Sequence, residues 1–144
     1  MNATIAKFGY PSSLLHEYRS WVVLLRPSQP TLGSLVLACK DEATSLGDLA
    51  AEAYAELAIA TADLERAVRA ALNCQKFNYL ALMMVDPHVH FHVIPRYSES
   101  REFEGATYQD AAWPKPPDVT SALALTPAQM ATLHARLRAG WAGA

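Results

Sequence analysis

The stretch that decides the fold is His88-Val89-His90-Phe91-His92-Val93-Ile94, which Pro95 follows. Histidines and apolar residues alternate along it, and a period of two is that of a β-strand. We expect a strand over Val89–Ile94 that ends at Pro95, with the three imidazoles on one face and the apolar side chains on the other. The apolar face can pack on a helix, so the pattern predicts that the histidines face a cleft.

Short β-rich runs surround this strand. They predict a hairpin from Leu14–Tyr18 and Trp21–Leu25, a strand over Leu35–Ala38 after a tight turn at Gly33, and a strand over Phe77–Val85 that is buried on much of both faces. Asp86-Pro87 is a turn signal between Phe77–Val85 and the histidine strand. A connection this short favours antiparallel pairing of those two strands.

Two helices are also predicted. Apolar residues recur at three- and four-residue steps in the first, which we place at Asp48–Leu72 with Ser45 as its N-terminal cap. The second opens with Thr126 as cap, Pro127 in the first position and Gln129 in the third. Between Arg96 and Pro117 the chain is polar and contains several prolines, and we expect this segment to wrap a surface.

Together these elements predict an α+β fold, a five-stranded antiparallel sheet with the long helix across one face and a C-terminal helix. The length of 144 residues fits one domain with a sizeable core. We therefore expect a single domain over residues 1–144, with residues 98–144 as a C-terminal extension that packs on it.

Composition excludes several classes of protein. The net charge of −2 argues against a broad basic surface for nucleic acid or an anionic membrane. No apolar run approaches the ~20 residues of a membrane span, and the first eight residues lack the layout of a signal peptide. Cys39 and Cys74 form no close motif and are expected to be buried, reduced thiols. The sequence predicts a cytoplasmic protein without nucleic-acid or membrane partners.

Three of the five histidines lie within five residues, and two explanations without nucleophilic chemistry compete for them. The first is a solvated polar face that happens to contain histidines. Each imidazole would then cost free energy in desolvation and side-chain freedom with nothing to offset it. A zinc site is the sharper competitor, but His88 and His92 would lie about 13 Å apart on a regular strand, too far to share one ion. Zinc would need two histidines and further ligands such as Asp86, His16 or Glu99, which show no recognised spacing.

The seven residues resemble the signature of the histidine-triad family, His-φ-His-φ-His-φ-φ, where φ is hydrophobic. Pro95-Arg96-Tyr97 continues as many members do, and Trp21–Pro27 and Gly33–Leu37 resemble the two earlier strands of the family. The similarity covers Leu14 to Tyr97. The pattern also resembles bacterial members that are grouped with diadenosine-polyphosphate hydrolases.

The resemblance implies nucleotidyl transfer. His90 corresponds to the histidine that attacks the α-phosphorus and forms a nucleotidyl-histidine, from which water or another acceptor takes the nucleotide. His92 would donate to a phosphate oxygen or to the leaving group, and His88 would orient the site. Neutral imidazole is a good nucleophile near pH 7. No cofactor is required, although a divalent cation could be bound with the substrate.

One ring nitrogen of His90 must be free to attack, so we expect the other to be held as a donor, commonly to a backbone carbonyl. The family also implies a homodimer with a sheet that continues through the interface. The expected substrate is a dinucleoside polyphosphate, a nucleoside phosphoramidate or a similar nucleotide ester.

Departures from the family pattern keep a second function open. Met83–Pro87 stands where many members have glycine and glutamine to hold phosphate, Arg26 replaces a nucleoside-binding asparagine, and Ser34 replaces a histidine. We expect Arg26 and Asn78 to contact substrate together with His92. The altered phosphate segment also fits a nucleotide-binding regulatory protein that turns over slowly or not at all.

Overall fold

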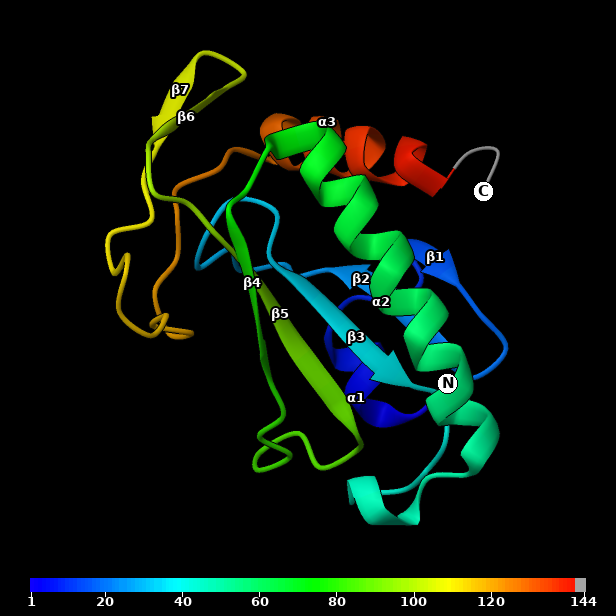
Figure 1. The fold of residues 1–144 in the computed structure, drawn as a ribbon. Coiled ribbons are helices and arrows are strands. Elements are labelled where there is room, and N and C mark those ends of the chain that lie inside the picture. The colour runs from blue at the N-terminus through cyan, green and yellow to red at the C-terminus, as the bar shows by residue number, and fades with distance from the viewer. Residues whose placement is uncertain (142–144) are drawn as a thin grey trace.

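A five-stranded antiparallel sheet forms the centre of the computed structural model, which describes residues 1–141 (Figure 1). Its strands are β1 (Leu14–Glu17), β2 (Trp21–Leu25), β3 (Leu35–Cys39), β4 (Lys76–Leu80) and β5 (His90–Arg96). They lie in the order β1-β2-β3-β5-β4, and every neighbouring pair is antiparallel. The predicted α+β class, the first hairpin and the pairing of the last two strands are confirmed.

Helix α2 (Ala51–Leu72) lies across one face of the sheet and closes the main core (Figure 1). Its apolar stripe, which includes Leu64 and Val68, packs with Trp21 and Val93 of the sheet, and all four are fully buried. The indole of Trp21 also donates to the carbonyl of Ala53 at 2.7 Å. Burial of this apolar surface is the dominant favourable contribution to folding.

The predicted start of the long helix at Asp48 is wrong. A single 3-10 turn, η1 (Leu46–Asp48), comes first, and the Ser45 side chain makes no capping hydrogen bond. Leu49 and Ala50 are then extended, and Ala50 occupies the cap position of α2. Leu49 is buried against the core, so the apolar period continues through the two extended residues. Periodicity alone could therefore not locate the start of α2.

The C-terminal part of the chain packs on the sheet and on α2. Helix α3 (Pro127–Arg138) begins with the predicted capping box of Thr126 and Gln129 and is followed by the turn η2 (Ala139–Trp141). The polar segment before it also contains a hairpin that the sequence did not predict, β6 (Arg101–Phe103) and β7 (Ala106–Tyr108). Strands of three residues are too short to show a period.

One helix was not predicted from the sequence: α1 (Ala3–Lys7), which covers the opposite face of the sheet. Asn2 caps it by accepting from the backbone N–H of Ile5. The side chain of Ile5 is fully buried in a small second core. The sheet residues of that core are Val22, Leu24, Val36 and Ala38. A helix of five residues has no apolar repeat from which it could be recognised.

The two strands nearest the histidines differ from their predicted bounds. Strand β4 ends at Leu80, which pairs with His92, so residues 81–89 form the connection to β5. Leu82, Met84 and Val85 are exposed there, and the prediction of a strand buried through Val85 is wrong. Strand β5 begins at His90 and continues through Pro95. The carbonyl of Pro95 accepts from the Thr31 side chain, beyond the end of β3. The nitrogen of a strand residue points to the same side as its carbonyl, so no ladder hydrogen bond is lost and proline is tolerated there.

Gly33 and the cysteines behave as predicted. Gly33 has a φ of +85°, and a Cβ there would meet the Leu72 side chain at 2.6 Å, so the turn requires glycine. Cys39 and Cys74 are buried, free thiols, and burial raises the pKa of Cys74 to about 11. Among residues 1–141, no helix is long and apolar enough to cross a bilayer.

Candidate histidine site

The alternation of the sequence places the histidines on the face of the sheet that α1 covers. His90 and His92 lie opposite Ala38 and Val36 of β3, whose side chains belong to the small second core. His88 lies two residues before β5 begins, but its ring also reaches α1. The predicted division of the stretch into a histidine face and an apolar face is therefore confirmed.

His90 is held in one tautomer. Its Nδ1 lies 2.7 Å from the carbonyl oxygen of His88. A carbonyl oxygen can only accept, so Nδ1 carries the proton and the lone pair is on Nε2. Among residues 1–141, Nε2 makes no hydrogen bond. This is the arrangement that an attacking imidazole requires, with one nitrogen fixed as a donor and the other free.

His92 is neutral at pH 7. Burial is the main cause that lowers the pKa of its ring to about 4; the positive charges of Arg26 and His90 act in the same direction, and Asp86 has a smaller opposite effect. The rings of His90 and His92 meet edge to face, with centroids 5.0 Å apart. The buried Nδ1 atom of His92 has no hydrogen-bond partner in the described part of the chain. A neutral His92 can still donate an N–H to an oxygen.

His88 is held by two side chains from distant parts of the chain. Its Nδ1 lies 2.8 Å from the hydroxyl oxygen of Thr4 in α1. Its Nε2 lies 3.0 Å from a carboxylate oxygen of Glu42, in the connection after β3. Neither contact was expected from the sequence, because nothing local marks residues so far from the triad.

The predicted open cleft is not present. His90 is 1% exposed and His92 is 7% exposed, because the ring of Phe8 lies over both with centroid distances of 5.7 Å. Next to Phe8, Lys7 forms an ion pair of 2.6 Å with Asp86 in the connection before β5. The triad lines none of the four main cavities found in residues 1–141. The end of α1 thus covers His90, the residue that the sequence predicts as nucleophile.

The two other expected substrate contacts lie at different distances from the triad. Arg26 follows β2, and its positive charge lowers the pKa of His92. Its two Nη atoms donate to the carbonyls of Ser28 and Val119. Its buried Nε has no partner in the described residues. Asn78 lies opposite Ile94, two pairs beyond His92 and on the same face.

Asn78 takes part in a network that ties the C-terminal tail to the sheet. Its side-chain oxygen accepts from Nη1 of Arg96 at 2.7 Å. Arg96 is buried and forms a two-point ion pair with Asp110, and it also donates to the carbonyl of Lys115. This network gives Asn78 a structural partner, and its contact with substrate stays a prediction.

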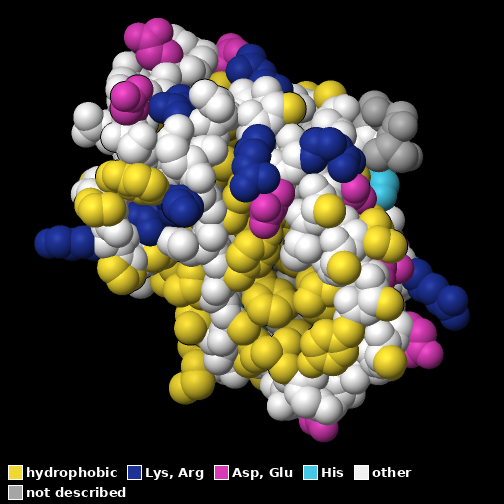
Figure 2. All heavy atoms as spheres, in the orientation of Figure 1, with side chains coloured by type: hydrophobic (Ala, Val, Ile, Leu, Met, Phe, Trp, Pro, Cys, Tyr) yellow, Lys and Arg dark blue, Asp and Glu magenta, His cyan; other side chains and the backbone are white. Residues whose placement is uncertain are grey.

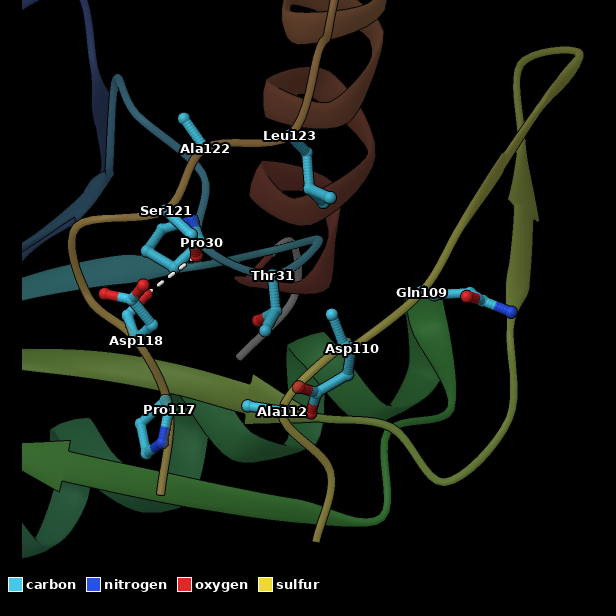
Figure 3. A pocket seen from close by; sticks show the side chains of 11 residues that line it. Pro30, Thr31, Gln109, Asp110, Ala112, Pro117, Asp118, Ser121, Ala122 and Leu123 are labelled. Carbon is cyan, nitrogen blue, oxygen red and sulfur yellow. Dashed lines mark hydrogen bonds between the residues drawn. The ribbon is translucent and has the colours of Figure 1, made fainter. Parts of the chain in front are cut away.

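The tail also encloses a cavity of about 430 Å³ that is separate from the triad. Figure 3 shows the side chains that line it, which come from Pro30 and Thr31, residues 109–112, Pro117, Asp118 and residues 121–123. Asp118 and Ser121 in its wall are joined by a hydrogen bond of 2.7 Å.

The residues named for a zinc site do not meet. Among residues 1–141, no group of three His, Cys, Asp or Glu side chains is placed to hold a metal ion. Asp86 is paired with Lys7, and His16 stacks on Trp141 at the far end of the sheet. Asp86 and His16 are therefore not brought together with the triad as a three-ligand set in the described residues.

Comparisons with known proteins concern the fold and the family of the chain. The chain resembles solved histidine triad proteins from Bradyrhizobium japonicum (23% identity, TM-score 0.74, 96% of this chain and 94% of that one) and Marinobacter aquaeolei (23%, 0.74, 97% and 93%). It also resembles a hypothetical histidine triad nucleotide-binding protein from Sulfolobus tokodaii (16%, 0.70, 95% and 88%). No curated protein matches the chain.

At these identities the solved structures show a common fold. The HIT domain pattern itself matches residues 12–99, which is more than half of the chain and includes all three histidines. The protein is therefore a member of the HIT domain family.

Proposed function

We propose that the protein is a nucleotide hydrolase or transferase that cleaves a dinucleoside polyphosphate or a related nucleotide conjugate at the α-phosphate, with His90 as the nucleophile. The observation that carries this proposal is the hydrogen bond from Nδ1 of His90 to the His88 carbonyl. It directs the lone pair of a neutral imidazole to Nε2, and such a ring needs no metal to activate it.

The reaction has two balanced steps. The Nε2 lone pair forms a bond to the α-phosphorus while the bond from phosphorus to the leaving group breaks, and the leaving group takes a proton from the N–H of His92 or from solvent. Water or another acceptor then attacks the phosphorus of the nucleotidyl-histidine and the bond from phosphorus to Nε2 breaks. The acceptor gives its proton back to His92 or to solvent, which returns both histidines to their starting state. The ring of His92 contacts that of His90, so its N–H is a donor available for the phosphate or the leaving group.

Two buried atoms without partners support a phosphate site beside His90. Nε of Arg26 and Nδ1 of His92 have no hydrogen-bond partner within residues 1–141. Buried polar atoms are usually satisfied, so orphaned ones mark either strain or a ligand. An oxyanion would satisfy both atoms and would offset the unfavourable effect of the Arg26 charge on His92. A divalent cation, where present, would arrive on the phosphates of the substrate.

A second candidate function is nucleotide-dependent regulation with little turnover. The observation that favours it is the cover of Phe8 over His90 and His92, together with the apolar Leu82–Val85 segment next to the triad. Such a protein would bind the nucleotide and form the adduct slowly or not at all.

The experiment that separates the two candidates is intact-mass measurement after rapid quench. The protein is mixed with diadenosine tetraphosphate or with adenosine 5′-phosphoramidate, and His90→Asn serves as control. A gain of one adenylyl group in the parent, absent from the variant, supports His90 as nucleophile. Binding with neither an adduct nor release of AMP favours regulation. An adduct that persists in the variant contradicts the assignment of His90.

We further propose that two chains associate through β4, an edge strand that pairs only with β5 among residues 1–141. The other edge, β1, is covered by α3, whose His134 donates to the carbonyl of Leu14. Figure 2 shows apolar side chains gathered over the lower half of the face that α2 and β4 present. An uncovered strand edge pairs readily with another strand. Light scattering at micromolar concentration should give twice the chain mass, and a monomer would contradict this assembly.

A further inference from the structure

We propose that Thr4 is a positioning residue of the histidine site, and that it acts through His88 to keep His90 in the tautomer that can attack. The effect on the reaction rests on the proposed function. The effect on the tautomer does not, because the hydrogen bonds that define it are present in the protein alone.

Thr4 contacts both the ring and the backbone of His88. Its side chain is 2% exposed, and its hydroxyl oxygen lies 2.8 Å from Nδ1 of His88 and 3.4 Å from the backbone nitrogen of the same residue. A hydroxyl can donate one hydrogen bond and accept others, so a single Thr4 group can serve both atoms. Valine has almost the same shape and neither capacity.

Glu42 decides the direction of these bonds. Its carboxylate lies 3.0 Å from Nε2 of His88, and a carboxylate only accepts, so Nε2 carries a proton. In the neutral ring, Nδ1 of His88 is then an acceptor. The Thr4 hydroxyl therefore donates to this nitrogen and accepts from the backbone N–H of His88.

The position of His88 matters because its carbonyl is the acceptor for His90. His88 lies before β5 begins, so the regular pairing of that strand does not hold it. The peptide that carries this carbonyl also carries the N–H of Val89, which donates to the carbonyl of Ala43 at 3.1 Å. Ala43 thus holds the N–H of this peptide, and Thr4 holds His88, the residue that supplies its carbonyl.

The loss of the Thr4 hydroxyl should free this end. His88 could then rotate its carbonyl away from His90, and the proton of His90 would no longer be confined to Nδ1. A ring protonated on Nε2 cannot attack through that atom. The N-terminal helix would therefore contribute to the chemistry of a histidine 86 positions away in the chain.

The test compares Thr4→Val with Thr4→Ser, which restores the hydroxyl, and with Thr31→Val. Thr31 is a matched control because it is equally buried, at 3% exposed, and its hydroxyl is likewise hydrogen-bonded, in this case as a donor to the carbonyl of Pro95. Two-bond ¹H–¹⁵N correlation spectra report the tautomer of each imidazole without any substrate. The rate of adduct formation at His90 is then measured by quenched intact mass with adenosine 5′-phosphoramidate.

In the parent, in Thr4→Ser and in Thr31→Val we expect the His90 proton on Nδ1. In Thr4→Val we expect a mixture of tautomers and a roughly tenfold slower adduct formation, the size of effect that one lost hydrogen bond can have. A Thr4→Val protein with the same His90 tautomer and rate as Thr31→Val overturns the proposal. If no protein forms an adduct but the tautomer still depends on the Thr4 hydroxyl, the positioning role stands and the proposed function fails.

Discussion

The two faces of the sheet are both buried, but by different means. One face meets the 22-residue helix α2, and Trp21, Leu64 and Val93 interlock there with no exposed surface. The other face meets the five-residue helix α1, and its histidines are covered by the single ring of Phe8. The first face is closed by a broad apolar contact and the second by a few individual contacts.

This difference separates stability from function. On the α2 face, burial removes apolar surface from water and nothing opposes it. On the histidine face, the same degree of burial leaves polar atoms without partners, which opposes folding, and it lowers the pKa of His92, which opposes folding once the pH falls below about 6.5. We therefore expect substitutions on the α2 face to change mainly stability, and substitutions on the histidine face to change mainly reactivity.

The largest expected effect is that of His90→Asn. Asparagine has no basic nitrogen to attack phosphorus, so turnover should fall by several orders of magnitude, beyond the ~10²–10⁴ typical of a lost general acid or base. His92→Asn should have a milder effect, because the nucleophile remains, and His88→Asn should fall between the two or mainly lower stability. Release of AMP measures each variant, with His134→Gln as a histidine control outside the site. If His90→Asn kept activity within tenfold of the parent while His92→Asn lost it, the assignment of His90 as nucleophile would be wrong.

On the α2 face, Leu64→Ala should lower the free energy of unfolding by about 3 kcal/mol, because it leaves a cavity in a fully buried position. Ile59 lies on the same helix and is 57% exposed, so Ile59→Ala should change the free energy by less than about 0.5 kcal/mol. Urea denaturation measures both. Similar losses in the two variants would show that the α2 face is not the main core.

Acid should weaken the histidine face. The pKa of His92 is about 4 in the folded protein against an ordinary value of 6.5, so the unfolded chain binds this proton first as the pH falls. Stability is then lost between pH 6.5 and 4, by about 2 kcal/mol at pH 4.5. Urea denaturation at pH 7 and pH 4.5 measures the loss, and His92→Gln, which cannot take up the proton, should lose that much less. An equal loss in parent and variant would contradict a depressed pKa.

The smallest expected effect concerns the cover itself. Phe8→Ala should expose His90 to diethyl pyrocarbonate and raise the rate of its modification about tenfold, which corresponds to the loss of a contact worth ~1.4 kcal/mol. Phe8→Leu keeps most of the apolar volume and should stay close to the parent. Peptide mass mapping identifies the modified histidine. Rapid modification of His90 in the parent would mean that Phe8 does not restrict access.

Local patterns determined much of this protein. The alternation of His88–Ile94 put the histidines on one face and their apolar neighbours on the other, because side chains of a strand point to opposite sides. The apolar period of α2 and the capping box of Thr126 and Gln129 are likewise local signals, and they predicted the helices and the α+β class. The histidine pattern also indicated the family and the expected nucleophile.

The state of the histidines was decided by tertiary structure alone. The carbonyl partner of His90 was expected in kind, but Thr4, Glu42 and Phe8 come from segments 46 to 84 positions away from the histidines that they contact. The exposure of Met84 and the early end of β4 also depended on the partner strand, since Leu80 pairs with His92 and the chain must then turn back. Local sequence carries propensity and period, whereas burial, tautomer and pKa arise from groups that only folding brings together.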